Sequence, residues 1–158
     1  MGFKKILVAI DRSVQADSVF GQALDLAKRD AAQLLILNCL NFDTYGLSTD
    51  NPLFSLRSDI TSIRIQEEWL LQELDQVDSW LATYVEQAQQ AGVAVESMSK
   101  VGNPASWIRD LAKSWQADLI VLGRRGRSLV TAILLGSVSN HVIHHAPCSV
   151  LIVQGVAP

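Results

Sequence analysis

The chain has 158 residues, 49% of them hydrophobic, and its 13 basic and 16 acidic residues give a formal net charge of −3. This length is enough to bury one core without disulfides or metals, so we expect a single domain over residues 1–158. The slightly negative charge argues against a nucleic-acid-binding surface, and neither a membrane span of ~20 apolar residues nor the apolar core of a signal peptide is visible, so we expect a cytoplasmic protein.

The first 40 residues have a strand–helix–strand pattern. A continuous apolar run at 6–10 ends at Asp11, and Ser13 can cap the helix that follows. A second short apolar run covers residues 34–37 and predicts the next strand. The helix between the two strands has one apolar face, which contains Phe20, Ala23, Leu24 and Ala27.

Residues 41–62 interrupt this alternation, and we predict that they form a flexible insertion. They contain turn residues and several apolar side chains but no period, and a long insertion of this kind is usually functional or disordered. A helical pattern returns at about Ile63, and Gly92 is placed to end that helix. Its apolar stripe is more typical of a helix packed on its own sheet than of a partner-binding surface. The stripe consists of Leu70, Leu74, Val77, Leu81, Tyr84 and Ala88, with Trp69 and Trp80 beside it.

The remainder of the chain repeats the alternation of strands and helices. Residues 93–101 alternate in polarity and predict an edge strand. Asn103 can cap the next helix, and Pro104 can occupy its first position. Short apolar runs at 118–122 and 149–153 predict a fourth and a fifth strand. The buried face of the helix that starts at Pro104 contains Ile108, Leu111, Ala112 and Trp115.

Five strands alternating with four helices predict a doubly wound, Rossmann-like α/β fold. We expect a five-stranded parallel sheet in the order 3-2-1-4-5, with helices on both faces. Such a sheet binds ligands outside the carboxyl ends of its strands, where the winding direction reverses. With the first and fourth strands as neighbours, Asp11 and Gly123 meet at that crevice.

A glycine-containing segment after the fourth strand is the strongest functional signal in the sequence. Gly123 ends the strand, and Gly136 and Ser137 precede a predicted helix over 138–145. Ser137 is a suitable N-cap, and the amides of residues 137–139 at the start of such a helix favour an anion. Glycines after strands and serines before helices are also ordinary turn and cap residues. Their combination across one strand, loop and helix nevertheless favours a phosphate site.

This segment matches neither of the common nucleotide-binding loops. A Walker A loop needs a Gly-Lys pair, which the sequence lacks, and a dinucleotide fingerprint needs three glycines within one tight turn. The carboxylate of Asp11 can accept a hydrogen bond from a ribose hydroxyl or adenine, or help to hold a magnesium ion carried by phosphates. We therefore expect a nucleoside phosphate as the ligand.

Cysteines and histidines offer two further sites, and for both we favour a structural role. Cys39 and Cys148 lie in apolar strand-like runs, which favours buried reduced thiols over a disulfide or redox pair. His141, His144 and His145 have a spacing that a metal could use. Histidines in a last helical turn are also explained by the helix dipole, and we prefer that explanation.

The sequence resembles the universal stress protein family over nearly its whole length. The nucleotide-binding branch of that family has the pattern Gly, two residues, Gly, nine residues, Gly, then Ser or Thr. The resemblance therefore implies binding of ATP or AMP. The matching residues are Gly123, Gly126, Gly136 and Ser137, and the similarity extends through the segments 6–13, 102–104, 117–123, 135–139 and 146–153.

The resemblance also implies roles for individual residues. Asp11 and Ala9 would lie near the ribose and adenine, the backbone of Cys39 near the adenine edge, and residues 137–139 at the phosphates. Asp11 would hold magnesium indirectly, through the nucleotide. Ala9 stands where some members have proline, and the loop arginines Arg124, Arg125 and Arg127 either contact phosphate or remain solvated. The predicted nucleotide-binding set is Ala9, Ile10, Asp11, Cys39, Leu122, Gly123, Arg124, Gly126, Arg127, Gly136, Ser137, Val138 and Ser139.

We expect a stress-response regulator that acts as a nucleotide-dependent sensor or switch, with segment 41–62 as the candidate movable element. The alternative is a slow ATPase or phosphotransferase, for which Asp11 and magnesium supply only part of the machinery, and we predict no catalytic residue. A nucleotide-free scaffold conflicts with the glycine pattern. The resemblance further implies a homodimer through the last strand, at 148–153, and we expect a regulatory protein partner that the sequence does not identify.

Overall fold

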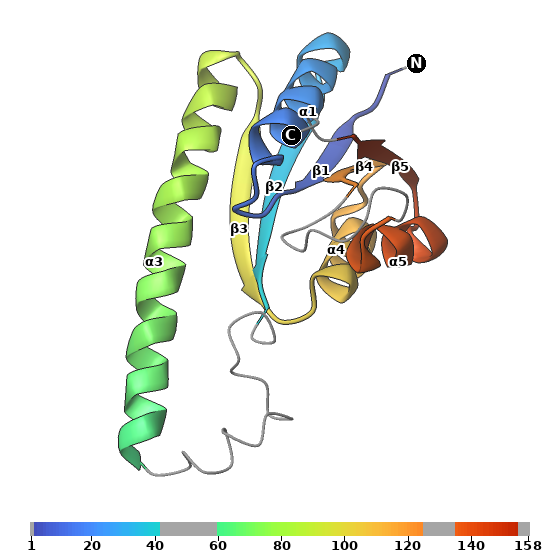
Figure 1. Ribbon diagram of the computed structural model, residues 1–158. Helices are drawn as coiled ribbons and strands as arrows, with labels where there is room; N and C mark the ends of the chain where they lie inside the picture. Colours follow the sequence, from blue (N-terminus) through green and yellow to red (C-terminus); the bar gives the residue numbers. More distant parts are fainter. Residues whose placement is uncertain (1, 42–59, 125–134, 155–158) are drawn as a thin grey trace.

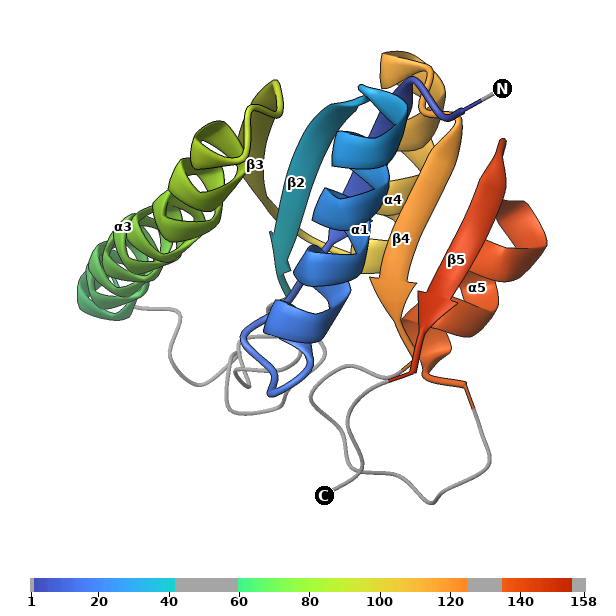
Figure 2. The ribbon, with the colours of Figure 1, turned by 90° about the horizontal axis from the view of Figure 1, so that it is seen from above.

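The computed structural model describes residues 2–41, 60–124 and 135–154. Its centre is a five-stranded sheet in the order β3-β2-β1-β4-β5, in which every neighbouring pair of strands is parallel (Figure 1). Helices cover both faces of this sheet (Figure 2). The predicted doubly wound fold, including its strand order, is confirmed.

The elements alternate along the chain as the apolar runs predicted. The strands are β1 (Lys5–Ala9), β2 (Gln33–Leu40), β3 (Val95–Val101), β4 (Leu119–Gly123) and β5 (Ser149–Val153). The helices are α1 (Ala16–Asp30), α3 (Ile60–Gln90), α4 (Pro104–Trp115) and α5 (Ser137–His145).

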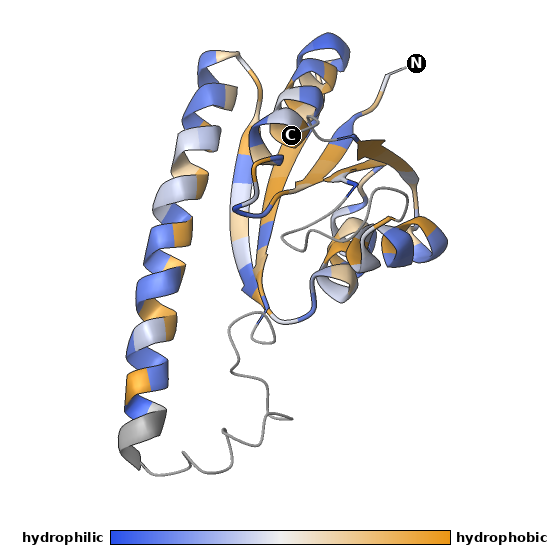
Figure 3. Ribbon diagram, viewed as in Figure 1, coloured by the Kyte–Doolittle hydropathy of each residue, from blue (hydrophilic) through white to orange (hydrophobic). Residues whose placement is uncertain are grey.

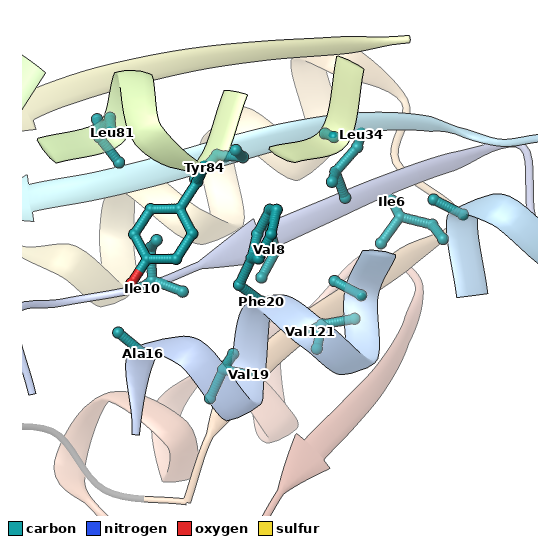
Figure 4. Close-up of a cluster of buried hydrophobic side chains, with 14 of the residues drawn as sticks. Ile6, Val8, Ile10, Ala16, Val19, Phe20, Leu34, Leu81, Tyr84 and Val121 are labelled. Atoms are coloured by element: carbon teal, nitrogen blue, oxygen red, sulfur yellow. The ribbon is translucent and has the colours of Figure 1, made fainter. Parts of the chain in front are cut away.

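Two cores lie on opposite faces of the sheet. The larger core joins α1 and α3 to one face, and its β1 members are Ile6 and Val8 (Figure 4). The smaller core joins α4 and α5 to the other face, and Leu7 is its β1 member. Because successive side chains of a strand point to opposite faces, a strand covered on both sides must be apolar at every position. This explains the unbroken apolar runs, which appear as hydrophobic colour along the central strands in Figure 3.

The apolar stripe predicted for the long helix packs on the sheet. Val77, Leu81, Tyr84 and Ala88 are buried in the larger core, and the two earlier leucines of the stripe pack against its margin. The Tyr84 ring packs against Phe20 in a tilted arrangement, with ring centroids 4.7 Å apart. Its hydroxyl donates a 2.7 Å hydrogen bond to Asp17, so this phenol ties α3 to α1. The partly buried indole of Trp80 contacts the Tyr84 ring edge-on.

The same helix is much longer than the strand beside it. At 31 residues α3 is about 46 Å long, whereas the seven-residue β3 spans about 23 Å. Its first turns extend past the carboxyl end of β3 (Figure 1). The helix begins at Ile60, slightly before the predicted start, and residues 42–59 of the predicted insertion lie outside the described residues.

Local capping signals were right for α4 and wrong for α1. Asn103 accepts a 3.2 Å hydrogen bond from the Ser106 amide, and Pro104 is the first residue of α4. Ser13 was predicted to cap α1, but that helix begins at Ala16, and its cap position makes no side-chain hydrogen bond. The hydroxyl of Ser13 accepts instead from the Gln15 amide, so it stabilises the turn before the helix.

Within the described ranges, no helix combines the length and the apolar character that crossing a membrane would require.

We predict that the packing of α3 on the sheet contributes strongly to stability. Leu81 is 1% exposed, so Leu81→Ala should lower the free energy of unfolding by about 2–5 kcal/mol through lost burial and a residual cavity. Leu71 lies on the same helix and is 66% exposed, so Leu71→Ala should change the free energy of unfolding by less than about 0.5 kcal/mol. Urea denaturation followed by circular dichroism measures both, and similar losses would contradict the packing.

Candidate functional site

The candidate site lies at the carboxyl edge of the sheet, between β1 and β4. These strands are neighbours, with Ala9 opposite Leu122, and the chain winds outward from them in opposite directions. In a doubly wound sheet, helix connections on opposite faces leave a crevice at this reversal point. The predicted meeting of the first and fourth strands is therefore confirmed at the level of the backbone.

The exit from β1 is held by two hydrogen bonds to β2 and by a turn. The amide of Ile10 donates to Leu37 at 3.0 Å, and the side-chain amide of Asn38 donates to the Ile10 carbonyl at 2.9 Å. Asp11 follows directly, and its Oδ1 atom accepts from the Ser13 amide at 3.1 Å. One carboxylate oxygen of Asp11 thus belongs to a tight turn, which fixes the direction of this half-buried side chain.

The exit from β4 is held just as closely. The hydroxyl of Ser139 donates a 2.7 Å hydrogen bond to the carbonyl of Gly123, the last residue of the strand. Arg124 continues the parallel ladder, because its amide donates to Val153 at 3.0 Å. Its carbonyl accepts from the Gly136 amide at 2.9 Å, so both ends of the glycine segment are fastened beside β4. The predicted site residues Gly126 and Arg127, with Arg125, lie outside the described residues.

The start of α5 differs by one residue from the prediction. Gly136 occupies the cap position with extended backbone, and Ser137 is already the first helical residue, with no side-chain capping bond. The Asn140 amide donates to Gly136 and closes the first turn. The amides of residues 137–139 consequently point out of the helix N-terminus, where they have no partner within the helix. The predicted position of Ser137 was wrong, but the arrangement of amides that suits an anion is present.

Four of the predicted site residues share one face of the sheet. Ala9, Cys39, Leu122 and Val138 all belong to the core under α4 and α5 or pack against it. Ile10 instead belongs to the opposite core. The side chains at the β1, β2 and β4 ends therefore face the same side as the start of α5.

Asn38 is a site residue that the sequence reasoning missed. It and Ser139 are the two buried polar residues of the described chain, at 4% and 3% exposure. Each donates to the carbonyl at the end of one of the two strands beside the crevice. The Oδ1 atom of Asn38 is buried with no hydrogen-bond partner, which is costly in a core. An asparagine inside an otherwise apolar run was the available signal.

The cysteines are free thiols, as predicted. Both are half-buried, and burial raises the pKa of Cys39 to about 12. Burial also raises the pKa of Cys148, with a smaller contribution from the Asp118 carboxylate. Both thiols therefore stay protonated near neutral pH, which suits a packing role.

The histidines of α5 are engaged at the end of their helix. The Nδ1 atoms of His144 and His145 lie 2.7 and 2.9 Å from the carbonyls four residues earlier. The rings of His141 and His145 stack with centroids 4.2 Å apart. In the described part of the chain no group of three or more histidine, cysteine, aspartate or glutamate side chains could hold a metal ion.

Comparison with known proteins identifies related sequences along the whole chain. A sequence model of the Universal stress protein family matches residues 2–154. Universal stress protein Sll1388 of Synechocystis sp. is 47% identical over 154 residues, which cover 98% of this chain and 99% of that protein.

Solved structures share the fold at lower sequence identity. Universal stress protein UspA from Lactobacillus plantarum has a TM-score of 0.80 at 24% identity, covering 97% of this chain and 99% of that one. A universal stress protein solved in complex with cAMP has a TM-score of 0.63 at 22% identity, covering 98% of each chain. A universal stress protein from Archaeoglobus fulgidus, solved in complex with dAMP, has a TM-score of 0.57 at 23% identity, covering 96% of this chain and 98% of that one.

We predict that Ser139 stabilises the junction of β4 and α5. Ser139→Ala should lower the free energy of unfolding by about 1–2 kcal/mol, because it leaves the Gly123 carbonyl without its donor. Ser114→Ala is the matched control, since that exposed hydroxyl makes a longer bond of 3.3 Å within α4. Thermal unfolding of both variants measures the difference, and equal effects would refute a special role for Ser139.

Proposed function

The chain belongs to the universal stress protein family, and on that basis we propose that it is a regulatory protein that binds an adenine nucleotide, ATP or AMP, at the carboxyl edge of its sheet. The observation that carries this proposal is the start of α5 beside the end of β4. Helix amides and a glycine strand end face the point where a doubly wound sheet takes its ligand.

The adenine nucleotide class is supported by the related structures. Two universal stress proteins of this fold were solved with cAMP and with dAMP, and both ligands combine adenine with a phosphate group. The glycine spacing around the segment 123–137 is the same sequence signal that first indicated a phosphate. A free nucleotide phosphate therefore suits this site better than a nucleic acid, whose recognition would need a basic surface on a chain with net charge −3.

In the proposed complex, different groups of the chain contact different parts of the nucleotide. The amides of residues 137–139 bind phosphate oxygens, helped by the positive end of the α5 dipole. Asp11 accepts a hydrogen bond from a ribose hydroxyl, because one of its oxygens is already held by the Ser13 amide and the side chain is oriented. Magnesium, when carried by the nucleotide, would reduce repulsion between the phosphates and the Asp11 carboxylate.

Binding of this kind serves regulation when the nucleotide has different affinities for two states of the protein. The long α3 extends past the sheet on the side where the nucleotide would bind. A nucleotide-dependent shift of this part of α3 would therefore alter a large surface of the protein. Hydrolysis would need a positioned water or acceptor and a charge clamp in addition to Asp11. We therefore propose a sensor or switch in a stress response.

We further propose that two copies associate through β5. This strand is one edge of the sheet, and its backbone groups on the outer side are free of a neighbouring strand among the described residues. Val150, Leu151 and Ile152 are each only partly buried. An apolar edge that is not covered invites pairing with another strand, which a second copy satisfies in a closed dimer.

We expect adenine nucleotide to be released from freshly purified protein on denaturation, detected by mass spectrometry, and ATP and AMP to bind in calorimetric titrations with and without magnesium. Gly136→Asp should weaken ATP binding at least tenfold, because it places a carboxylate beside the phosphates. The loss should shrink at high salt, which screens that repulsion. Phosphate release followed over hours would show whether any hydrolysis accompanies binding.

Gly136→Asn is the matched control for this variant. Aspartate and asparagine are both favourable at a helix cap and have nearly the same size, so both variants should keep α5 folded. Only the charged variant should lose much affinity for ATP. Absence of any bound or titratable adenine nucleotide in the wild type would refute the proposed function, whereas equal affinity of both variants would show that the phosphates lie elsewhere.

For the dimer, we expect sedimentation of the wild-type protein as two copies and of Leu151→Lys as one copy, because a charged edge opposes strand pairing. Val95→Lys is the control, since Val95 is a partly buried residue on the opposite edge strand β3. Both variants should retain the circular dichroism of the folded protein. A monomeric wild type, or dissociation by Val95→Lys alone, would contradict association through β5.

A further inference from the structure

A cation and an aromatic ring lie at the other end of the same sheet edge. Lys100, near the end of β3, is the register partner of Cys39 on β2. Its ammonium nitrogen is 5.1 Å from the centroid of the Trp107 ring, on the first half of α4. These three residues come from three elements, and neither Lys100 nor Trp107 belongs to the site predicted from the sequence.

The ring of Trp107 is held in place by the backbone around it. Its indole nitrogen donates a 2.9 Å hydrogen bond to the carbonyl of Val101, the last residue of β3. Gly102 follows with φ of +130°, and a Cβ at this position would approach the indole nitrogen to 3.1 Å. The turn therefore needs glycine, and the half-buried ring forms a rigid wall at the end of the strand.

Lys100, Cys39 and Trp107 face the same side of the sheet as the start of α5. Cys39 and Trp107 both pack against the core under α4 and α5, and Lys100 is level with Cys39 in the parallel ladder. The positive charge of Lys100 acts on the thiol, since it partly offsets the rise in the pKa of Cys39 that burial causes. The ammonium is thus close to the β2 end of the crevice.

The width of the sheet sets the distance between the Lys100–Trp107 pair and the proposed phosphate position at the start of α5. From β4 to β3 there are three strand spacings, or about 14 Å. If phosphates lie at the start of α5 and the ribose lies at Asp11, the base of the same nucleotide extends over the ends of β2 and β3. That position brings the base to the Lys100 ammonium and the Trp107 ring.

We propose that Lys100 contacts the base, donating a hydrogen bond to a ring nitrogen or other acceptor of a purine, with Trp107 as the apolar wall beside it. This inference rests on the proposed function and adds a residue that selects the base. An ammonium has only donors, so it favours base edges that present acceptors. A purine ring has several such nitrogens, and its face suits a neighbouring indole.

A second lysine–tryptophan pair in the molecule provides a comparison, because its lysine is engaged in a hydrogen bond within the protein. Lys5 lies 5.3 Å from the centroid of Trp115, at the amino edge of the sheet. Its ammonium also donates to the Trp115 carbonyl at 3.1 Å, so its charge is satisfied internally. Lys100 forms no such bond and no ion pair with any other described residue, which leaves its donors available at the ligand edge.

The test combines variants of the protein with analogues of ATP. Calorimetry would measure the affinity of wild type, Lys100→Met and Lys5→Met for ATP and for its 1-deaza, 3-deaza and 7-deaza analogues, each of which lacks one ring nitrogen. We expect Lys100→Met to weaken ATP binding about tenfold, as for loss of a charged hydrogen bond. One of the analogues should bind the wild type about tenfold more weakly than ATP does. The same analogue and ATP should bind Lys100→Met with equal affinity. Lys5→Met should behave like the wild type throughout.

The outcomes separate this inference from the proposed function. If the wild type binds no adenine nucleotide, both fail. If it binds ATP and Lys100→Met has unchanged affinity, or loses the same factor for every analogue, the base contact alone is refuted, because a distant charge acts equally on all of them. Lys100→Arg keeps the cation and should retain most of the ATP affinity. Circular dichroism confirms folding, and Lys100→Gln replaces the methionine variant if that variant unfolds.

Discussion

Burial of the two central strands from both sides governs where this fold can place polar groups. Ile6, Leu7 and Val8 of β1 and Ile120 and Val121 of β4 have no exposed surface, because α1 and α3 cover one face and α4 and α5 the other. Strands enclosed in this way can present polar groups only where they leave the core. Since all five run parallel, those exits gather at one carboxyl edge. The candidate site lies at this edge, between the ends of β1 and β4.

The two buried polar side chains of the described chain act on this same edge. Asn38 holds the carbonyl of Ile10 as the chain leaves β1, and Ser139 holds the carbonyl of Gly123 as it leaves β4. Burying an amide or a hydroxyl is unfavourable unless it is hydrogen-bonded, and Asn38 keeps one buried oxygen without a partner. A core built only for stability would favour apolar residues at both positions. Their presence on either side of the crevice is best explained by a need to hold the strand exits, and thereby Asp11 and the start of α5, in fixed positions.

Local signals predicted some boundaries well and others less well, for a physical reason. Asn103 and Pro104 start α4 as predicted, because a side-chain cap and a fixed φ act within one turn of the chain. Ser13 and Ser137 have equally suitable side chains, yet neither caps its helix. At α5 the preceding backbone is held by the bond from the Gly136 amide to Arg124, a residue twelve positions earlier, and this contact places the cap at Gly136. A helix start that follows an anchored loop depends on the anchor as well as on propensity.

Sequence patterns were sufficient to predict the order and type of the elements, the strand arrangement, the family and the position of the glycine segment. Unbroken apolar runs, helical stripes and glycine spacing are properties of neighbouring residues, so they can be seen without a structure. Which distant side chains come together at the crevice could be seen only once the chain was folded. Asn38 reaches Ile10, and Lys100 lies level with Cys39 and close to Trp107, because strand register and the packing of two helix layers place them on particular faces. Register and face depend on contacts between segments far apart in the chain, and a local pattern contains no record of them.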